Sequence, residues 1–322
     1  MKALVIGAAG FVGKHLMRHL RKDCGWAVAA TKLPHEQIDG LDEFAKLGVD
    51  IFDLDILNQD DVSCLLKKNQ PDCIFHLAAQ SSVSLSWENP ALTVDVNIKG
   101  TVNVLEALRQ LGKKPKVLLV GSGEEYGRVN QDEVPICEDN ALRPGNVYAA
   151  TKACQGILGK IYADAYNLDI IIVRAFNHIG PGQSPVFVVS DFCKQVAEIE
   201  AGQREPVIRV GNLSAKRDFT DVRDVVRAYG LLIEYGKRGE TYNVGSGKAI
   251  DIDSILKAIL AKSSADIEVV TDKSKLRPID VPIIEADIGK LRMLTNWKPE
   301  IELEQTIAET LEHWKRNIRR SQ

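Results

Sequence analysis

Residues 2–16, KALVIGAAGFVGKHL, decide the fold of this chain. Residues 3–7 form a continuous apolar run, typical of a strand buried on both faces of a parallel sheet. Three glycines follow at the G-x-x-G-x-x-G spacing, and residues 11–23 have the apolar periodicity of an amphipathic helix. Glycines at such a turn let the backbone approach a pyrophosphate, which the helix N-terminus attracts. The stretch predicts a dinucleotide-binding turn made by Gly7, Gly10, Phe11, Val12 and Gly13.

The remainder of the first half continues this alternation of strands and helices. Helices are expected near 59–69, 91–112 and 149–167, and further strands at 27–31, 49–55, 73–79, 116–122 and 169–176. This order implies a parallel sheet with right-handed crossovers, covered on both faces. After about residue 177 the pattern loosens, and residues 240–247 are expected to return to the large sheet. The prediction is an α/β fold, a Rossmann-type doubly wound parallel sheet with a smaller α/β C-terminal substrate domain.

The length and composition fit two domains of an ordinary globular protein. The 322 residues suffice for two moderate cores. We expect a dinucleotide-binding domain of residues 1–176 plus about 219–246, and a substrate domain of about 177–218 plus 247–322. A net charge of -3, with both signs interspersed, gives a nucleic-acid partner no global electrostatic support.

Targeting signals and metal-binding patterns are not visible in the sequence. The apolar N-terminus is too short and glycine-broken for a membrane span, and it lacks a convincing signal-peptide cleavage pattern. The six cysteines show no CxxC and no Cys/His ligand spacing, so reduced thiols are expected. We therefore expect a cytoplasmic protein without a membrane partner and without a metal site.

The second and third strands end at residues that would contact the adenosine half of a dinucleotide. An NAD site usually has an acid at the end of the second strand, where this chain has Thr31 and Lys32. These two residues suit a 2'-phosphate, so NADP(H) is expected to be preferred over NAD(H). Asp55 and Ile56 follow the third strand and suit the adenine amine and ring. A simple strand-end cap explains Asp55 equally well.

A tyrosine, a lysine and a serine form the candidate catalytic group. Tyr148 and Lys152 lie one turn apart on the helix near 149–167, so both side chains reach a shared site. A phenol has a pKa of about 10, and a nearby ammonium with a cationic nicotinamide ring lowers it. Ser122, at the end of the strand 116–122, would polarise the substrate oxygen. Lys152 can also hold the cofactor ribose.

Motifs along essentially the whole chain resemble those of the extended short-chain dehydrogenase/reductases that act on nucleotide sugars. Within that family, the sequence is most similar to the branch of GDP-mannose 4,6-dehydratases and GDP-4-keto-6-deoxy-mannose reductases. The motifs are GAAGFVG, DLDI, HLAAQSSVSLSWENP, VNIKGTVNVLEA, GSGEEYG, YAATK, RAFNHIGPGQ, RDFTDVRD and LRPIDVP.

The resemblance implies roles for further residues. It places the catalytic chemistry on Ser122, Tyr148 and Lys152, with Glu124 beside them, and makes Leu77, Ala78 and Ala79 part of the nucleotide groove. The sugar nucleotide would contact Gln80, Ser81, Ser122, Glu124, Asn177, Lys194, Arg217 and Arg277. Arginines suit this role because a pyrophosphate needs fixed, bidentate cationic donors, although solvated surface arginines would look the same in sequence.

Two reactions of this branch fit the sequence, and Glu124 divides them. A dehydratase needs a carboxylate near C5 and C6 of the sugar, and Glu124 occupies that base position; such an enzyme keeps its NADP tightly bound. Three features favour a reductase: Gly123 beside it, Ser82 where a histidine is frequent, and no arginine-rich loop after Asn177. We therefore expect NAD(P)H-dependent reduction of the C4 ketone of a GDP-4-keto-6-deoxy-hexose, with GDP-mannose 4,6-dehydration as the alternative. A nucleotide-sugar 4-epimerase and a non-catalytic dinucleotide-binding regulator are less favoured.

Two further expectations rest on the resemblance. Relatives pair the helix of residues 91–109 and the helix after Tyr148 with their copies, so a homodimer through a four-helix bundle is expected. Burial of the same residues inside one subunit would give the same pattern. The guanine base is implied by resemblance alone, which leaves CDP- and UDP-sugars open.

Glu125 is expected to point away from Glu124, because successive residues leaving a strand face opposite sides.

Overall fold

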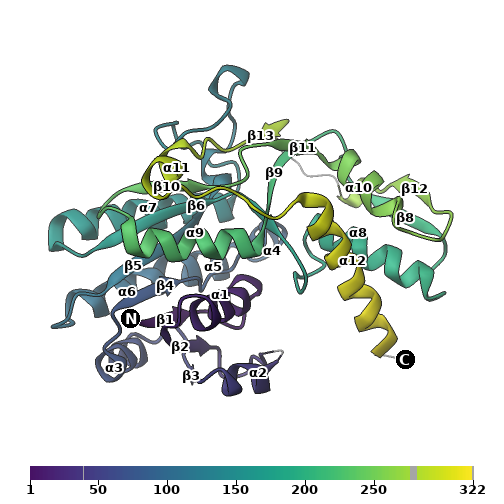
Figure 1. Cartoon of the computed structure of the whole chain (residues 1–322). Coiled ribbons are helices and arrows are strands. Elements are labelled where there is room, and N and C mark those ends of the chain that lie inside the picture. Colours follow the sequence, from purple (N-terminus) through teal and green to yellow (C-terminus); the bar gives the residue numbers. More distant parts are fainter. Residues whose placement is uncertain (39, 276–280, 321–322) are drawn as a thin grey trace.

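The computed structural model describes residues 1–38, 40–275 and 281–320. Its centre is a seven-stranded sheet in the order β10-β6-β5-β4-β1-β2-β3, and each adjacent pair is parallel (Figure 1). The strands are β1 (Lys2–Ile6), β2 (Ala27–Lys32), β3 (Val49–Asp53), β4 (Cys73–His76), β5 (Lys116–Ser122), β6 (Ile170–Ala175) and β10 (Thr241–Val244). The strand order reverses between β1 and β4, where a doubly wound sheet binds its ligand. The expected return of residues 240–247 to this sheet is confirmed by β10.

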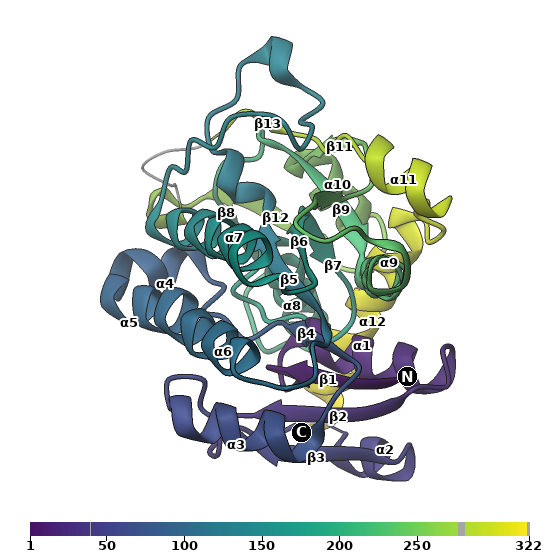
Figure 2. The same cartoon turned by 90° about the vertical axis from the view of Figure 1, so that its left-hand side faces the viewer.

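Helices cover both faces of the large sheet (Figure 2). Side chains of β1 alternate between two cores: Ala3 and Val5 pack on one face, Leu4 and Ile6 on the other. The first face is covered by α1 (Phe11–Lys22) and α9 (Val222–Tyr235), with α2 (Leu41–Lys46) and α11 (Gly289–Thr295) at its margins. The second face is covered by α3 (Gln59–Asn69), α6 (Gly100–Arg109) and α7 (Val147–Tyr166). Burial on both faces explains why the strands read as unbroken apolar runs.

The helix expected over residues 91–112 is divided into pieces. After α4 (Val83–Glu88) come α5 (Pro90–Val94), a π-helical turn at Asp95–Lys99, and α6. A π turn accommodates an extra residue in a helix and is frequent at functional sites. Apolar periodicity alone did not reveal it.

A second core belongs to the smaller lobe at the right of Figure 1. Its central strand β9 (Lys216–Asp221) pairs with β7 (Asn177–Ile179), β11 (Ala249–Asp251) and β13 (Ile283–Ile284). Beside them lies a β8–β12 pair (Val207–Val210, Glu268–Thr271), and the lobe's helices are α8 (Val188–Glu200), α10 (Ile252–Leu260) and α12 (Leu303–Arg320). Leu291 and Trp297, within the range expected for the sugar domain, pack in the core of the large sheet.

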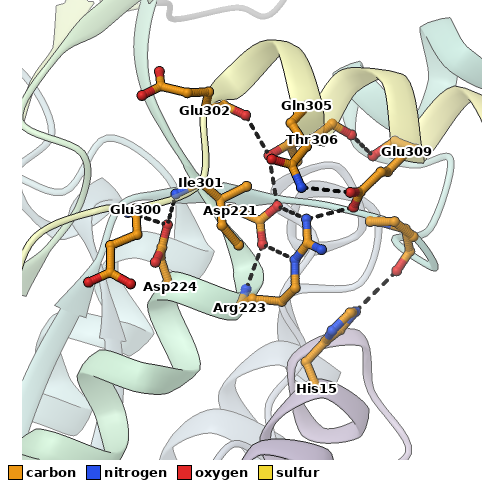
Figure 3. A network of polar contacts seen from close by, with 12 residues as sticks. His15, Asp221, Arg223, Asp224, Glu300, Ile301, Glu302, Gln305, Thr306 and Glu309 are labelled. Atoms are coloured by element: carbon orange, nitrogen blue, oxygen red, sulfur yellow. Dashed lines mark hydrogen bonds and ion pairs between the residues drawn. The ribbon is translucent and has the colours of Figure 1, made fainter.

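A polar network joins α9 of the large-sheet layer to α12 of the smaller lobe (Figure 3). Asp221 at the end of β9 accepts hydrogen bonds from Arg223 (Nε, 2.9 Å) and from the Thr306 hydroxyl (2.7 Å). Arg223 also pairs with Glu309 of α12 at 2.7 Å. Asp224 accepts two backbone amides at the start of the α12 segment, each at 2.9 Å. We call these contacts the α9–α12 network; it holds the two cores together.

The following properties concern the described residues, 1–38, 40–275 and 281–320. Within these ranges, none of the helices combines the length and apolar character that a membrane crossing requires. In the same part of the chain, no group of three or more His, Cys, Asp or Glu side chains is placed to hold a metal ion. The cysteines are all free thiols.

Candidate active site

The glycines of the β1–α1 turn are required for different reasons. Gly7 has a φ of +85°, and a Cβ there would lie 2.6 Å from the backbone of Ala78. A Cβ on Gly13 would lie 2.5 Å from the carbonyl oxygen of Ala8. A Cβ on Gly10 would meet nothing closer than 3.5 Å. The fold therefore requires glycine at two positions, and the room left at Gly10 fits the close approach of a pyrophosphate to the helix N-terminus.

The end of β2 supports this turn. The Thr31 hydroxyl accepts the Gly7 amide at 3.2 Å, and the Thr31 carbonyl accepts the Ala8 amide at 2.7 Å. Thr31 is buried, so its first role is to fix the turn. The first turn of α1 contains no acidic side chain, which leaves its amide donors and dipole available to an anion.

Lys32, the second residue expected at a 2'-phosphate, already has a partner. Its ammonium lies 2.5 Å from Asp53 at the end of β3, and it donates to the carbonyls of Leu33 (3.2 Å) and Pro34 (3.4 Å). Sequence reasoning missed Asp53, because the contact depends on β2 and β3 being neighbours with Lys32 opposite Asp53.

The residues assigned to the adenine lie just beyond this pair. The Asp55 carboxylate accepts the Leu57 amide at 2.9 Å, which is the strand-end cap left open from the sequence. Ile56 is buried against α6, where a Cβ on Gly100 would lie 2.5 Å from the Ile56 side chain. Their contact with adenine stays a prediction.

The segment after β4 closes the other side of the turn. β4 ends at His76, three residues before the expected end, because the amides of Leu77 and Ala78 both turn to the Ile6 carbonyl at 2.9 Å. Ala78 thereby reaches Gly7, and Ala79 leads into the following loop. These three residues lie along the expected nucleotide groove.

Ser122, Tyr148 and Lys152 are brought together where α7 packs on β5. Ser122 and Tyr148 are both 8% exposed, and the Ser122 side chain lies near enough to the Tyr148 phenol to lower its pKa. Lys152 is buried one turn along α7, and its ammonium donates to the Val120 carbonyl (2.8 Å) and to Gln155 (3.0 Å). The three residues form one connected group at the carboxyl end of the sheet.

Burial sets the protonation of this group. Burial raises the pKa of Tyr148 well above its usual value, the hydrogen bond with Ser122 lowers it, and the charges of Glu124 and Glu125 raise it. Burial lowers the pKa of Lys152 to about 8, against the charge of Glu125. The phenol is therefore a protonated donor until a cationic neighbour stabilises its phenolate.

The two consecutive acids have different partners. The Glu124 carboxylate is half-buried and accepts the side-chain amide of Asn146, the N-cap of α7, at 3.3 Å. Glu125 is fully buried; its carboxylate accepts the Ser122 amide at 2.7 Å and pairs with Arg174 of β6 at 3.0 Å. Glu125 therefore points away from Glu124, as expected, and Glu124 is the acid beside Tyr148.

A buried asparagine that sequence reasoning missed ties the loop after β4 to α7. Asn97 lies in the π turn Asp95–Lys99; its carbonyl oxygen accepts the Gln80 amide (2.8 Å) and its NH₂ donates to the Thr151 hydroxyl (2.9 Å). Thr151 in turn donates to the Tyr148 carbonyl at 2.7 Å. A polar residue inside an otherwise apolar helix was the available signal.

Gln80 and Ser81, expected at the sugar nucleotide, differ in environment. The Gln80 side chain donates to the Thr93 hydroxyl (2.9 Å) and the Ser82 carbonyl (3.0 Å), and it accepts the Ser82 amide. These bonds fix the loop. Ser81 is exposed at its tip.

On the smaller lobe, Asn177 and Arg217 lie on neighbouring strands. Asn177 is half-buried in β7, opposite Phe219 of β9. Arg217 is 8% exposed in β9 and donates to the carbonyls of Lys216 (2.8 Å) and Val281 (2.7 Å). A guanidinium held in this way is a fixed cation, as a pyrophosphate contact requires.

Of the other two basic residues expected at the substrate, Lys194 lies apart from this group. Lys194 on α8 is 38% exposed; its ammonium lies 3.6 Å from Glu198 and 5.7 Å from the ring centroid of Trp314 on α12. It faces α12. Arg277 lies outside the described residues.

The dinucleotide turn touches the smaller lobe directly. The Phe11 ring stacks on His178 of β7 with centroids 6.1 Å apart and an interplanar angle of 14°. His15 of α1 contacts the Pro181 carbonyl at 3.1 Å (Figure 3). The cofactor turn and the expected sugar lobe are therefore in direct contact.

The chain is similar over nearly its whole length to known proteins. A family model described as GDP-mannose 4,6 dehydratase matches residues 4–310. The GDP-6-deoxy-D-mannose reductase of Pseudomonas aeruginosa is 31% identical over 319 residues, covering 99% of this chain and 98% of that protein.

Solved structures show the same likeness in three dimensions. RMD from Pseudomonas aeruginosa, complexed with NADPH, matches with a TM-score of 0.85 at 31% identity, covering 98% of this chain and 99% of the other. The UDP-glucose 4-epimerase of Thermus thermophilus, complexed with NAD, also gives 0.85, at 30% identity and with 98% and 99% coverage. These two relatives hold different nicotinamide cofactors.

Proposed function

The chain belongs to the GDP-mannose 4,6-dehydratase family, and from this premise we propose that it reduces the C4 ketone of a GDP-4-keto-6-deoxy-hexose with NAD(P)H. The observation that carries the proposal is the buried group of Ser122, Tyr148 and Lys152, in which the Ser122 side chain lowers the pKa of the Tyr148 phenol and the Lys152 ammonium lies one turn along α7. In this arrangement Tyr148 is the proton donor, and the Ser122 hydroxyl lies beside it. Full-length similarity to a GDP-6-deoxy-D-mannose reductase supports the choice of reaction.

The residues divide the chemistry between them. Bound NAD(P)H supplies the hydride. Tyr148 gives its proton to the developing C4 alkoxide, and Ser122 donates a hydrogen bond to the same oxygen. Lys152 stabilises the phenolate that remains. Arg217 holds the pyrophosphate, and burial of the phenol keeps water from competing for the proton.

The alternative, GDP-mannose 4,6-dehydration, is favoured by one observation. Glu124 lies beside Tyr148, and a carboxylate there can remove a sugar proton. Incubation with GDP-mannose alone, and separately with the 4-keto-6-deoxy product plus NADPH, tests the two reactions. We expect turnover in the second mixture. Turnover of GDP-mannose without added cofactor would establish the dehydratase instead.

We propose that NADP(H) is preferred over NAD(H), and modestly. No acid stands at the end of β2 itself, where Thr31 and Lys32 suit a 2'-phosphate, which supports the preference. The Asp53 carboxylate on Lys32 limits it, because a 2'-phosphate must compete for the same ammonium. The ratio of KM values for NADH and NADPH measures the preference.

We propose a cytoplasmic homodimer in which α7 and the helical segment of residues 91–109 pair with their copies as a four-helix bundle, with α4 beside them. Large apolar side chains are exposed on these helices: Trp87 (50%), Leu92 (40%), Val94 (43%), Ile157 (54%) and Ile161 (51%). Exposed large apolar side chains on neighbouring helices are typical of interaction sites. Light scattering at micromolar concentration checks the assembly, and Ile157→Glu with Ile161→Glu should give monomers. A monomeric wild-type protein would contradict it.

A further inference from the structure

Glu125 lies directly behind the catalytic group, and the proposed mechanism does not use it. Its carboxylate accepts the backbone amide of Ser122 at 2.7 Å, while the Ser122 hydroxyl accepts the Glu124 amide at 3.2 Å. This reciprocal capping box fixes the 3₁₀ turn Gly123–Tyr126 that follows β5. Glu125 therefore determines how Ser122 leaves the strand.

Two glycines leave space for this carboxylate. A Cβ on Gly121 would lie 2.2 Å from the Glu125 Oε1 atom. On α7, a Cβ on Gly156, one turn beyond Lys152, would lie 3.8 Å from Oε2. Glycine at 121 therefore leaves room for the carboxylate, which lies between β5 and the helix of the catalytic tyrosine and lysine, in ordinary contact range of Gly156.

A buried cation pairs with the carboxylate. Arg174 of β6 donates from Nε to Glu125 at 3.0 Å and from Nη1 to the Tyr126 hydroxyl and the Glu138 carbonyl, each at 3.0 Å. The Tyr126 hydroxyl in turn donates a hydrogen bond to the side-chain oxygen of Asn243 at 2.7 Å. Burial raises the pKa of Glu125, and Arg174 together with the Ser122 amide opposes that rise. A buried charge is retained only when it is paired and hydrogen-bonded in this way.

We propose that Glu125 is a positioning residue that keeps Lys152 in its ammonium form and so sets the upper pH limit of proton transfer from Tyr148. The proposal rests on the proposed reductase function, because it assigns a partner to the lysine of that site. Glu125 itself touches neither substrate nor cofactor.

The surroundings of Lys152 assign this role to Glu125. The ammonium donates to two neutral acceptors, the Val120 carbonyl of β5 and the side-chain oxygen of Gln155 on α7. From β4 it faces His76, whose pKa is lowered to about 3 by burial and by Lys152, so that this ring is neutral. Among the described residues, the charge that favours the ammonium is that of Glu125, opposing burial.

The test is the pH profile of Glu125→Gln. Glutamine can still accept the Ser122 amide, but it removes the charge. We expect the alkaline limb of kcat/KM for NADPH-dependent reduction to move down by about one pH unit, as for the loss of a close opposite charge. Glu125→Asp keeps the charge and should leave the limb at its wild-type pH, even if kcat falls.

Two controls separate charge from structure. Glu133→Gln removes an equivalent carboxylate, which closes a capping box with Asn130 and pairs with Arg143 at 2.7 Å on an exposed loop; its limb should not move. The double variant Glu125→Gln/Arg174→Gln leaves neither partner of the buried pair charged, so it serves if the single variant does not fold. The same downward shift is expected.

A readout without the sugar separates this proposal from the proposed function. NADPH binding is followed by fluorescence between pH 6 and pH 10, roughly the range in which lysine titrates. Binding should weaken as the pH rises, and in Glu125→Gln this loss should begin at a lower pH than in wild type. If wild type reduces no keto sugar but this difference appears, the proposed function fails and the role of Glu125 stands. A loss of kcat/KM that is equal at every pH, with both limbs unmoved, would reduce Glu125 to a structural cap.

Discussion

At the scale of single residues, Tyr148 is the group whose removal separates catalysis from binding. Tyr148→Phe keeps the ring and removes the proton donor, so kcat should fall by about 10²–10⁴-fold, the usual contribution of a general acid. NADPH affinity should change little, because the cofactor turn and Lys152 remain. Spectrophotometric rates with parallel NADPH titration give both numbers. A variant with near-wild-type turnover would point to a non-catalytic, regulatory protein.

The Lys32–Asp53 pair makes a second prediction at this scale. Asp53→Asn releases Lys32 and removes a negative charge from the expected 2'-phosphate site, so the NADPH over NADH binding ratio should rise. Partly exposed ion pairs are worth up to about 1 kcal/mol, which corresponds to about fivefold. Lys32→Gln should lower the ratio. Fluorescence titrations with both cofactors measure it, and an unchanged ratio in both variants would place the 2'-phosphate elsewhere.

At the scale of elements, the β1–α1 turn distinguishes a glycine needed for folding from one needed for binding. Gly13→Ala would place a Cβ 2.5 Å from the Ala8 carbonyl and should lower the free energy of unfolding by about 1–3 kcal/mol. Gly10→Ala meets no atom within 3.5 Å, so stability should hold while dinucleotide affinity falls. Chemical denaturation and cofactor titration on both variants check this. Tight NADPH binding by Gly10→Ala would contradict the assignment of the phosphate site.

Local patterns predicted the elements well and their long-range contacts poorly. Apolar runs and the glycine turn were enough to predict the parallel sheet, since burial on both faces leaves a direct trace in sequence. The π turn at Asp95–Lys99 was missed because Asn97 is held by distant partners, Gln80 and Thr151. The pairing of Glu125 with Arg174 joins residues 49 apart, which no local spacing encodes. Ser122, Tyr148 and Lys152 were found because they follow one another along the chain in a recognisable motif. Arg277 lies outside the described residues.

At the scale of the whole molecule, the α9–α12 network makes the joining of the two cores sensitive to acid. Burial by itself raises the pKa of Asp221, but hydrogen bonds from Arg223 and Thr306 leave it below its ordinary value. A carboxyl group with a depressed folded pKa adds stability above its unfolded pKa of about 3.9, and this is lost as the pH falls through the folded value. Unfolding free energy should therefore drop below about pH 4.

Asp221→Asn tests this at constant geometry, because asparagine still caps α9. It should cost about 1–3 kcal/mol at neutral pH and flatten the acid dependence of the unfolding free energy. Asp251→Asn changes another N-cap, a half-buried one on α10, and should cost less. An acid dependence as steep in Asp221→Asn as in wild type would assign the effect to other groups.

The position of β10 has a consequence for synthesis on the ribosome. β10 pairs along β6 and completes the large sheet only with residues 241–244, after the strands and the two helices of residues 177–235 have been made. At about 5–20 residues per second, one edge of β6 waits several seconds without its neighbour. Unpaired strand edges invite pairing with other chains. The nascent protein therefore passes through a vulnerable interval in which chaperone cover of that edge should decide the yield of folded enzyme.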